Sequence, residues 1–286
     1  MNCDVTVLNL SGIYDQESFY RTDKSSRFID LRDITGTNCM CDDAAKREIM
    51  QRIESLTGPV KTSDEPGMRG NREDFSQSDL CIHFIDNGNY HYLSALYLSM
   101  VKEPFSLVVL DHHPDMQRPM FDILSCGGWI LDVIEKNEFP RDVHIIGADR
   151  HLIDELDESD KRKVCFYDAD DVFTKDGRVI LPKTEFPVYL SVDKDVIRRS
   201  DIVTNWDQGD LSAEQVLLFV RELILRDYNR GEGGQVPDTG AFCSSLLGVD
   251  ICGECTPEQE DCDIYAAIAG NDNFNRQIIE LLRNLN

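Results

Sequence analysis

The chain has 286 residues, of which 41% are hydrophobic, and a formal net charge of −24. This length allows a sizeable core, in one large α/β domain or two smaller ones. Such an acidic surface repels nucleic acid backbones and anionic membranes, and we expect neither as a partner. We expect small or cationic ligands instead.

The amino terminus has no basic segment followed by a long apolar one, which predicts no signal peptide. The longest apolar runs are the size of strands and are interrupted by charge, so no transmembrane segment is predicted. The ten cysteines are scattered, and Cys81 and Cys165 lie inside apolar, strand-like runs. We therefore expect reduced thiols and a cytoplasmic location.

Strands and helices alternate along the chain. The patterns predict strands at Val5–Leu10, Ser26–Arg32, Leu80–Ile85, Phe105–Leu110, Val143–Ala148, Lys163–Tyr167, Phe186–Val192 and Leu246–Cys252. They predict helices at about 42–56, 92–101, 128–135, 212–225 with Ser212 as N-cap, and 273–285, and loops at 58–78 and 229–240. Such alternation predicts a three-layer α/β/α fold with a mostly parallel sheet of about eight strands. No linker divides it, so one domain is expected over residues 1–286.

The apolar run Phe105–Leu110 ends in Asp111-His-His-Pro-Asp115. In open α/β sheets, ligands bind beyond the carboxyl ends of the strands, where these polar residues would lie. Asp111, His113 and Asp115 are two residues apart, so in an extended segment they point to one side. Two acids and an imidazole placed together would repel one another unless a cation held them, which predicts a metal site.

Other predicted strands end in similar residues. His91 follows one strand, Asp193 and Asp195 follow another, and Glu254 follows the last. In a parallel sheet these ends lie along one edge, so the residues would meet in one cleft. Two imidazoles and four aspartates are too many ligands for one structural zinc ion. They suit two divalent ions that share bridging carboxylates, for which manganese is the natural candidate.

In these motifs the sequence resembles the arginase/agmatinase/formiminoglutamase ureohydrolases. Four segments carry the resemblance, in the order of the family and over residues 80 to 257: Gly88-Asn-Tyr-His91, Asp111-His-His-Pro-Asp115, Ser191-Val-Asp-Lys-Asp195 and Glu254-Cys-Thr-Pro257. The second and third match the family patterns Asp-x-His-x-Asp and Ser-x-Asp-x-Asp completely. The first keeps only its first glycine and its histidine, and the last lacks the asparagine of Glu-x-Asn-Pro. Together the four are far more specific than any one alone.

The resemblance implies a binuclear manganese hydrolase of linear C–N bonds in a small cationic guanidino or formimino compound, with a metal-bridging hydroxide as nucleophile. It implies two Mn²⁺ per chain, with ligands assigned as follows: His91 and Asp115 to one ion, His113 and Asp195 to the other, and Asp111 and Asp193 to both. Asp115 would orient the hydroxide and shuttle its proton, and Glu254 would hold the guanidinium. Members of the family commonly form trimers or hexamers, so a homo-oligomer is possible.

The chain also departs from the family. Arginases carry a His-Gly pair after the second motif, and its histidine is thought to relay protons, whereas this chain has Gly128 near that place. Gln117 and Ser125 are loose equivalents of the residues that hold the amino acid end of arginine, and Trp129 could wall the substrate pocket. His151 could replace the proton relay, although a histidine in a surface loop is the commoner situation. The substrate therefore stays open.

Three alternatives remain. Cys252 and Cys255 form a Cys-x-x-Cys that could bind zinc or act in redox chemistry with Cys243 or Cys262, but no second pair completes such a site. A deacetylase of the same fold would use a single zinc ion. A superfamily member could also keep its metals and bind a ligand without hydrolysing it. Metal content distinguishes the deacetylase, and hydrolysis of guanidino compounds distinguishes the binding protein.

Overall fold

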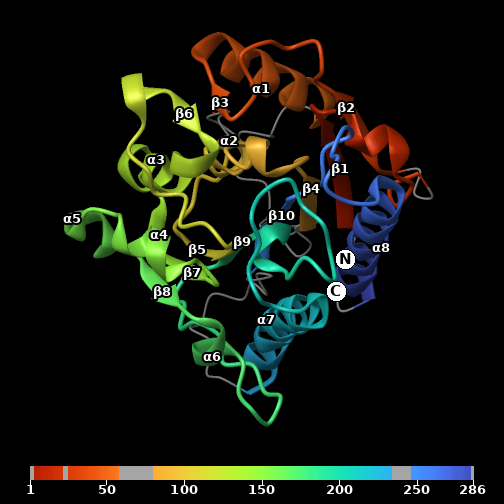
Figure 1. Cartoon of the computed structure of the whole chain (residues 1–286). Helices are drawn as coiled ribbons and strands as arrows, with labels where there is room; N and C mark the ends of the chain where they lie inside the picture. The colour runs from red at the N-terminus through yellow and green to blue at the C-terminus, as the bar shows by residue number, and fades with distance from the viewer. Residues whose placement is uncertain (1–2, 22–24, 58–79, 234–245, 285–286) are drawn as a thin grey trace, which may run out of the picture.

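A computed structural model describes residues 3–21, 25–57, 80–233 and 246–284 of the chain (Figure 1). Its strands are β1 (Cys3–Asn9), β2 (Arg27–Asp30), β3 (Met40–Cys41), β4 (Leu80–Phe84), β5 (Phe105–Leu110), β6 (Leu124–Ser125), β7 (Pro140–Ile146), β8 (Cys165–Tyr167), β9 (Val188–Asp193) and β10 (Leu246–Cys252). Its helices are α1 (Asp43–Thr57), α2 (Leu93–Leu98), α3 (Trp129–Lys136), α4 (Arg150–Asp154), α5 (Glu158–Lys161), α6 (Ala169–Val172), α7 (Ala213–Gly233) and α8 (Ile264–Asn284).

Eight strands form one sheet in the order β2-β1-β4-β10-β9-β5-β7-β8, and all its neighbouring pairs are parallel. The predicted sheet and fold class are therefore confirmed. The last two strands of the chain, β9 and β10, insert between β4 and β5. As a result, the carboxyl ends of β4, β10, β9 and β5 lie side by side in the middle of the sheet.

Both faces of the sheet are covered, as β5 shows. All six of its residues are buried. Leu107 and Val109 belong to the core that includes α1, α2 and α3, while Val108 and Leu110 belong to the core that includes α7 and α8. Figure 1 shows these two groups of helices on opposite sides of the sheet. A strand buried on both faces is apolar at nearly every position, which explains the apolar run that only Ser106 interrupts.

The helix at residues 212–225 begins as predicted, because Ser212 caps it. Its Oγ accepts a hydrogen bond from the Gln215 amide (3.1 Å), and the Gln215 side chain accepts one from the Ser212 amide (2.8 Å). However, α7 continues to Gly233, so the loop predicted from 229 is wrong over residues 229–233. Residues 234–240 and the loop predicted at 58–78 lie outside the described residues.

The last helix starts at Ile264, nine residues before the predicted start at 273. Asp263 caps it, accepting hydrogen bonds from the amides of Tyr265 (3.1 Å) and Ala266 (3.2 Å). Gly270 and Asn271 are weak helix formers and obscured this first half. In the fold, Asn271 is fully buried and hydrogen-bonded, so tertiary contacts outweigh propensity there. None of the described helices has the length and apolar character needed to cross a membrane.

Candidate metal centre

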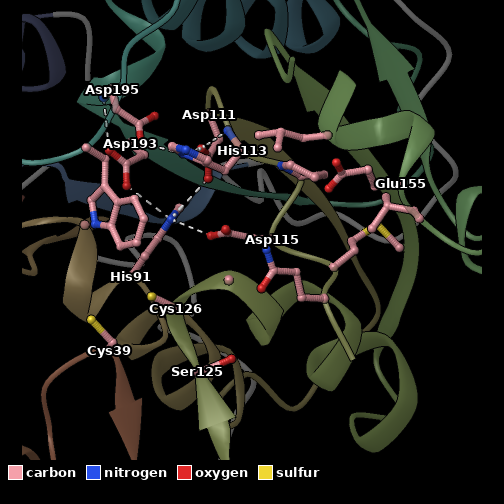
Figure 2. A pocket seen from close by; sticks show the side chains of 18 of the residues that line it. Cys39, His91, Asp111, His113, Asp115, Ser125, Cys126, Glu155, Asp193 and Asp195 are labelled. Atoms are coloured by element: carbon pink, nitrogen blue, oxygen red, sulfur yellow. Dashed lines mark hydrogen bonds and ion pairs between the residues drawn. The ribbon is translucent and has the colours of Figure 1, made fainter. Parts of the chain in front are cut away.

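The predicted metal ligands meet at the carboxyl ends of β4, β5 and β9. They line one cavity of about 670 Å³, which Figure 2 shows from close by. All six side chains take part: His91, Asp111, His113, Asp115, Asp193 and Asp195. Figure 2 shows His91 between Asp115 and Asp193, and His113 beside Asp111. The inserted strands therefore bring together groups that are far apart in the sequence, such as His91 and Asp195.

Backbone amides fix the orientation of three of the aspartates. Oδ1 of Asp111 accepts a hydrogen bond from the His113 amide (2.6 Å), and Oδ1 of Asp193 accepts one from the Asp195 amide (3.0 Å). Oδ1 of Asp195 accepts one from the His112 amide (3.0 Å). Each carboxylate is thus held by one oxygen, and the other oxygen is free to face the centre of the cluster.

His91 lies at the centre of these carboxylates. Its Nδ1 is 3.0 Å from Asp115 Oδ2, 3.2 Å from Asp111 Oδ2 and 3.3 Å from Asp193 Oδ2. Its Nε2 lies 2.9 Å from Ser191 Oγ. A single ring N–H cannot satisfy three carboxylates, so most of this negative charge has no cationic partner from His91. The serine of the Ser-x-Asp-x-Asp motif orients the ring.

The second imidazole, that of His113, also has a partner at each of its ring nitrogens. His113 Nδ1 lies 2.9 Å from Asp195 Oδ2, and its Nε2 lies 3.1 Å from Asp207 Oδ1. A carboxylate behind a metal-binding histidine sets its tautomer and its orientation. The sequence analysis missed Asp207, because it lies in a loop and follows no predicted strand.

The cluster is electrostatically unbalanced without a cation. Burial and the neighbouring Asp195 raise the pKa of Asp193 to about 7, and burial and Asp111 raise the pKa of Asp195 to about 6. For His91, burial lowers the pKa, but contacts with Asp111 and Asp115 outweigh it and raise the pKa well above its usual value. Carboxylates that resist ionisation beside an imidazole that keeps its proton indicate a site that attracts positive charge.

The donor atoms fall into overlapping groups of the size that one ion can hold. His91, Asp111 and Asp115 form one group, and Asp111, His113 and Asp195 form another; within each, the ligand atoms lie within 4.8 Å of one another. Asp111 belongs to both groups. Nitrogen and carboxylate oxygen ligands around a shared carboxylate fit a pair of divalent ions.

The prediction that Trp129 walls the cavity is wrong. Trp129 lies behind the metal ligands and supports them. Its side chain is fully buried, and its indole N–H donates a hydrogen bond to Asp115 Oδ2 (2.7 Å). Its ring centroid lies 4.8 Å from that of His91. Asp115 itself has a φ of 46°, a strained conformation for a residue other than glycine. The indole therefore helps to hold a constrained carboxylate.

Of the remaining predicted residues, the fold brings some to the cavity and keeps others away from it. Gln117 and Ser125 line the cavity. His151 is exposed on α4 and is not among the cavity residues, so the structure does not bring it to the centre. At Gly128 an added Cβ would lie 2.6 Å from the Gln117 carbonyl oxygen. The position near the family's relay histidine therefore has no room for a side chain.

The structure does not bring Glu254 to the cavity either. Gly253 has a φ of 90°, and beyond this turn the Glu254 side chain points toward α8. It is fully buried, and its Oε1 lies 2.5 Å from Lys194 Nζ and accepts a hydrogen bond from Asn275 (2.8 Å). Lys194 also donates to Asn271 (2.7 Å) and Asn275 (3.2 Å). Glu254 already holds a cation of the chain's own.

We call Glu17, Lys194, Glu254, Asn271 and Asn275 the Lys194 cluster. Glu17 is buried in it and accepts a hydrogen bond from Asn275 (3.1 Å). Burial and the charge of Glu254 raise the pKa of Glu17 well above its usual range. Glu17 and Glu254 therefore share the single ammonium of Lys194 in this cluster.

Comparison with known proteins supports the fold. The chain is 30% identical, over 254 residues, to a protein of Thermotoga maritima described as uncharacterized; the match covers 88% of this chain and 80% of that protein. The two proteins belong to one family. No protein-family model matches the chain.

Solved structures of ureohydrolases have the same architecture. Formimidoylglutamase of Bacillus subtilis superposes with a TM-score of 0.59 at 16% identity, over 99% of this chain and 87% of that one. Agmatine ureohydrolase of Thermoplasma volcanium gives 0.57 at 15% identity, over 99% and 92%. Entamoeba histolytica arginase gives 0.53 at 15% identity, over 97% and 99%. The predicted resemblance is thus confirmed at the level of the fold.

Proposed function

We propose that the protein is a binuclear metal-dependent hydrolase that cleaves a linear C–N bond in a small cationic guanidino or formimino compound. One observation carries the proposal. Six ligand side chains converge in the wall of one cavity, and Asp111 belongs to two overlapping ligand groups. A single-zinc deacetylase needs only one such group, so the second group favours two ions.

The cavity is suited to a cationic substrate. Beyond the metal ligands, its wall contains the carboxylates of Glu155, Asp157 and Asp160. Arg118 also lies there, but its guanidinium is paired with Asp160 at 2.8 Å. The excess of acidic groups in a concave site concentrates positive ligands.

Two divalent ions held by His91, His113 and the four aspartates would supply a water molecule acidic enough to act as a nucleophile near neutral pH. Asp115 would hold that water and accept its proton, in the orientation that the Trp129 indole supports. Ser191 and Asp207 contact the Nε2 atoms of the two imidazoles, and this arrangement would leave each Nδ1 to face the ions.

Because Glu254 is occupied by Lys194, the cationic end of the substrate must be held by other carboxylates of the cavity. Asp207 is one candidate, since it lines the cavity and its side chain is 71% exposed. A guanidinium would then be held differently from the way the family resemblance implies.

The test is hydrolysis by metal-loaded protein. Protein loaded with Mn²⁺, and separately with Zn²⁺, is incubated with guanidino and formimino compounds of graded chain length, and release of urea or formamide is measured. We expect two ions per chain and turnover of at least one compound, lost in Asp193→Asn. The exposed Asp210→Asn is the matched control.

If two ions bind but no compound is hydrolysed, the result would favour a metal-dependent binding protein without hydrolase activity. The observation that favours a binding protein is the lack of space for a side chain at Gly128, near the position of the family's relay histidine. One zinc ion per chain and deacetylation would instead favour the deacetylase.

A further inference from the structure

Cys252 is the last residue of β10, between the ends of β4 and β9. Its side chain is fully buried, and its thiol donates a hydrogen bond to the Asn87 carbonyl oxygen at 3.4 Å. Sγ forms a third ligand group with His91 and Asp193, in which all ligand atoms lie within 4.8 Å of one another. Neither Cys255 nor Cys262 belongs to any such group among the described residues.

This sulfur makes the two halves of the centre chemically different. The half around His113 offers only nitrogen and oxygen ligands from Asp111, His113 and Asp195. The half around His91 offers the same kinds of ligand and also a thiol. Thiolate favours zinc and other borderline ions, whereas carboxylate, imidazole and water suit manganese.

The spacing of the three ligand atoms fits this role. Zinc–sulfur and zinc–nitrogen bonds of about 2.3 and 2.0 Å place two ligands of one ion at most about 4.3 Å apart. In a tetrahedral site the same two bonds place the ligands about 3.5 Å apart. A group within 4.8 Å therefore closes on an ion with shifts of about 1 Å or less. Cys252 approaches from β10, whereas Asp111 and Asp115 come from the end of β5, so the thiol would add to these ligands and would not replace one.

Resting on the proposed binuclear centre, we propose that Cys252 is a ligand of the ion at His91, and that this position selects zinc, cobalt or iron(II) over manganese. On binding, the S–H bond breaks, its electron pair forms the metal–sulfur bond, and the proton leaves to solvent. The centre would then hold a borderline ion at His91 and a hard ion at His113.

The test uses the metal-free full-length protein titrated with Co²⁺. A cobalt–thiolate bond gives a charge-transfer band in the near-ultraviolet, which we expect in the wild type and not in Cys252→Ser. Cys255→Ser is the matched control, because Cys255 is equally buried and belongs to no ligand group. Serine keeps the hydrogen-bond donor toward Asn87, and circular dichroism checks that each variant is folded.

A second readout is metal preference. We expect Cys252→Ser to weaken Zn²⁺ binding by about tenfold or more while changing Mn²⁺ binding much less. X-ray absorption of the zinc-loaded wild type should show sulfur at about 2.3 Å. Cobalt bound with a spectrum that Cys252→Ser leaves unchanged would overturn the role of Cys252 alone. No cobalt bound would overturn this inference and the binuclear centre together.

Discussion

The metal centre and the Lys194 cluster occupy opposite sides of the same strand ends. They differ in how the charge of their buried carboxylates is balanced. In Asp193-Lys-Asp195, the two aspartates face the cavity while Lys194 between them points toward α8. The Lys194 cluster contains its own ammonium, 2.5 Å from Glu254. The metal centre has four carboxylates and, for positive charge, only its two imidazoles. The first cluster is completed by the chain itself, whereas the unbalanced one is where we propose that external cations bind.

The largest effect is expected from breaking the metal centre. Asp193→Asn removes one carboxylate of the cluster while keeping its size. Loss of a ligand that also stabilises the reacting water should lower hydrolysis by about 10³-fold or more. Steady-state urea or formamide release measures this. If Asp210→Asn lowers activity equally, the assignment of Asp193 fails.

Breaking the Lys194 cluster should affect folding rather than metal chemistry. Lys194→Met leaves Glu254 buried without its cation and should lower the free energy of unfolding by about 3–5 kcal/mol. The double variant Lys194→Met/Glu254→Gln should recover most of this loss. Urea denaturation measures both. A loss below about 1 kcal/mol would show that the pair is not the cation–carboxylate unit described here.

Removing metal tests which cluster depends on an external ion. At a free metal concentration 100-fold above Kd, bound metal stabilises the fold by about 2.7 kcal/mol. Chelation should therefore lower the Tm by about 5–10 °C. Asp193→Asn should show little of this shift, while Lys194→Met should keep it. An equal response in the two variants would contradict the separation of the clusters.

The smallest effect is expected from the support of Asp115. Trp129→Phe keeps a ring against His91 but removes the N–H that binds Asp115. Metal affinity should fall by about 10- to 100-fold, as for other residues behind metal ligands. Calorimetric titration measures it. Trp206→Phe is the control, since that indole donates to Asn89 and not to a metal ligand.

Much of the fold could be predicted because its signals are local. Largely apolar runs identified β5 and β9, and Ser212 identified the start of α7. The start of α8 could not be predicted, because Asn271 is unfavourable for a helix until it is paired with Lys194. That contact is 77 residues distant in the sequence and exists only in the fold.

The sequence by itself determined which strand ends carry clustered carboxylates and imidazoles, because residue identity and spacing follow from residues adjacent in the chain. Only the tertiary structure decided which side chains reach the cavity. The turn at Gly253 directs Glu254 to Lys194, and the packing of α3 places Trp129 behind Asp115. The insertion of β10 beside β4 and β9 brings Cys252 to His91 and Asp193. Side-chain direction at the end of a strand depends on the neighbouring strands and helices, and a one-dimensional pattern does not contain them.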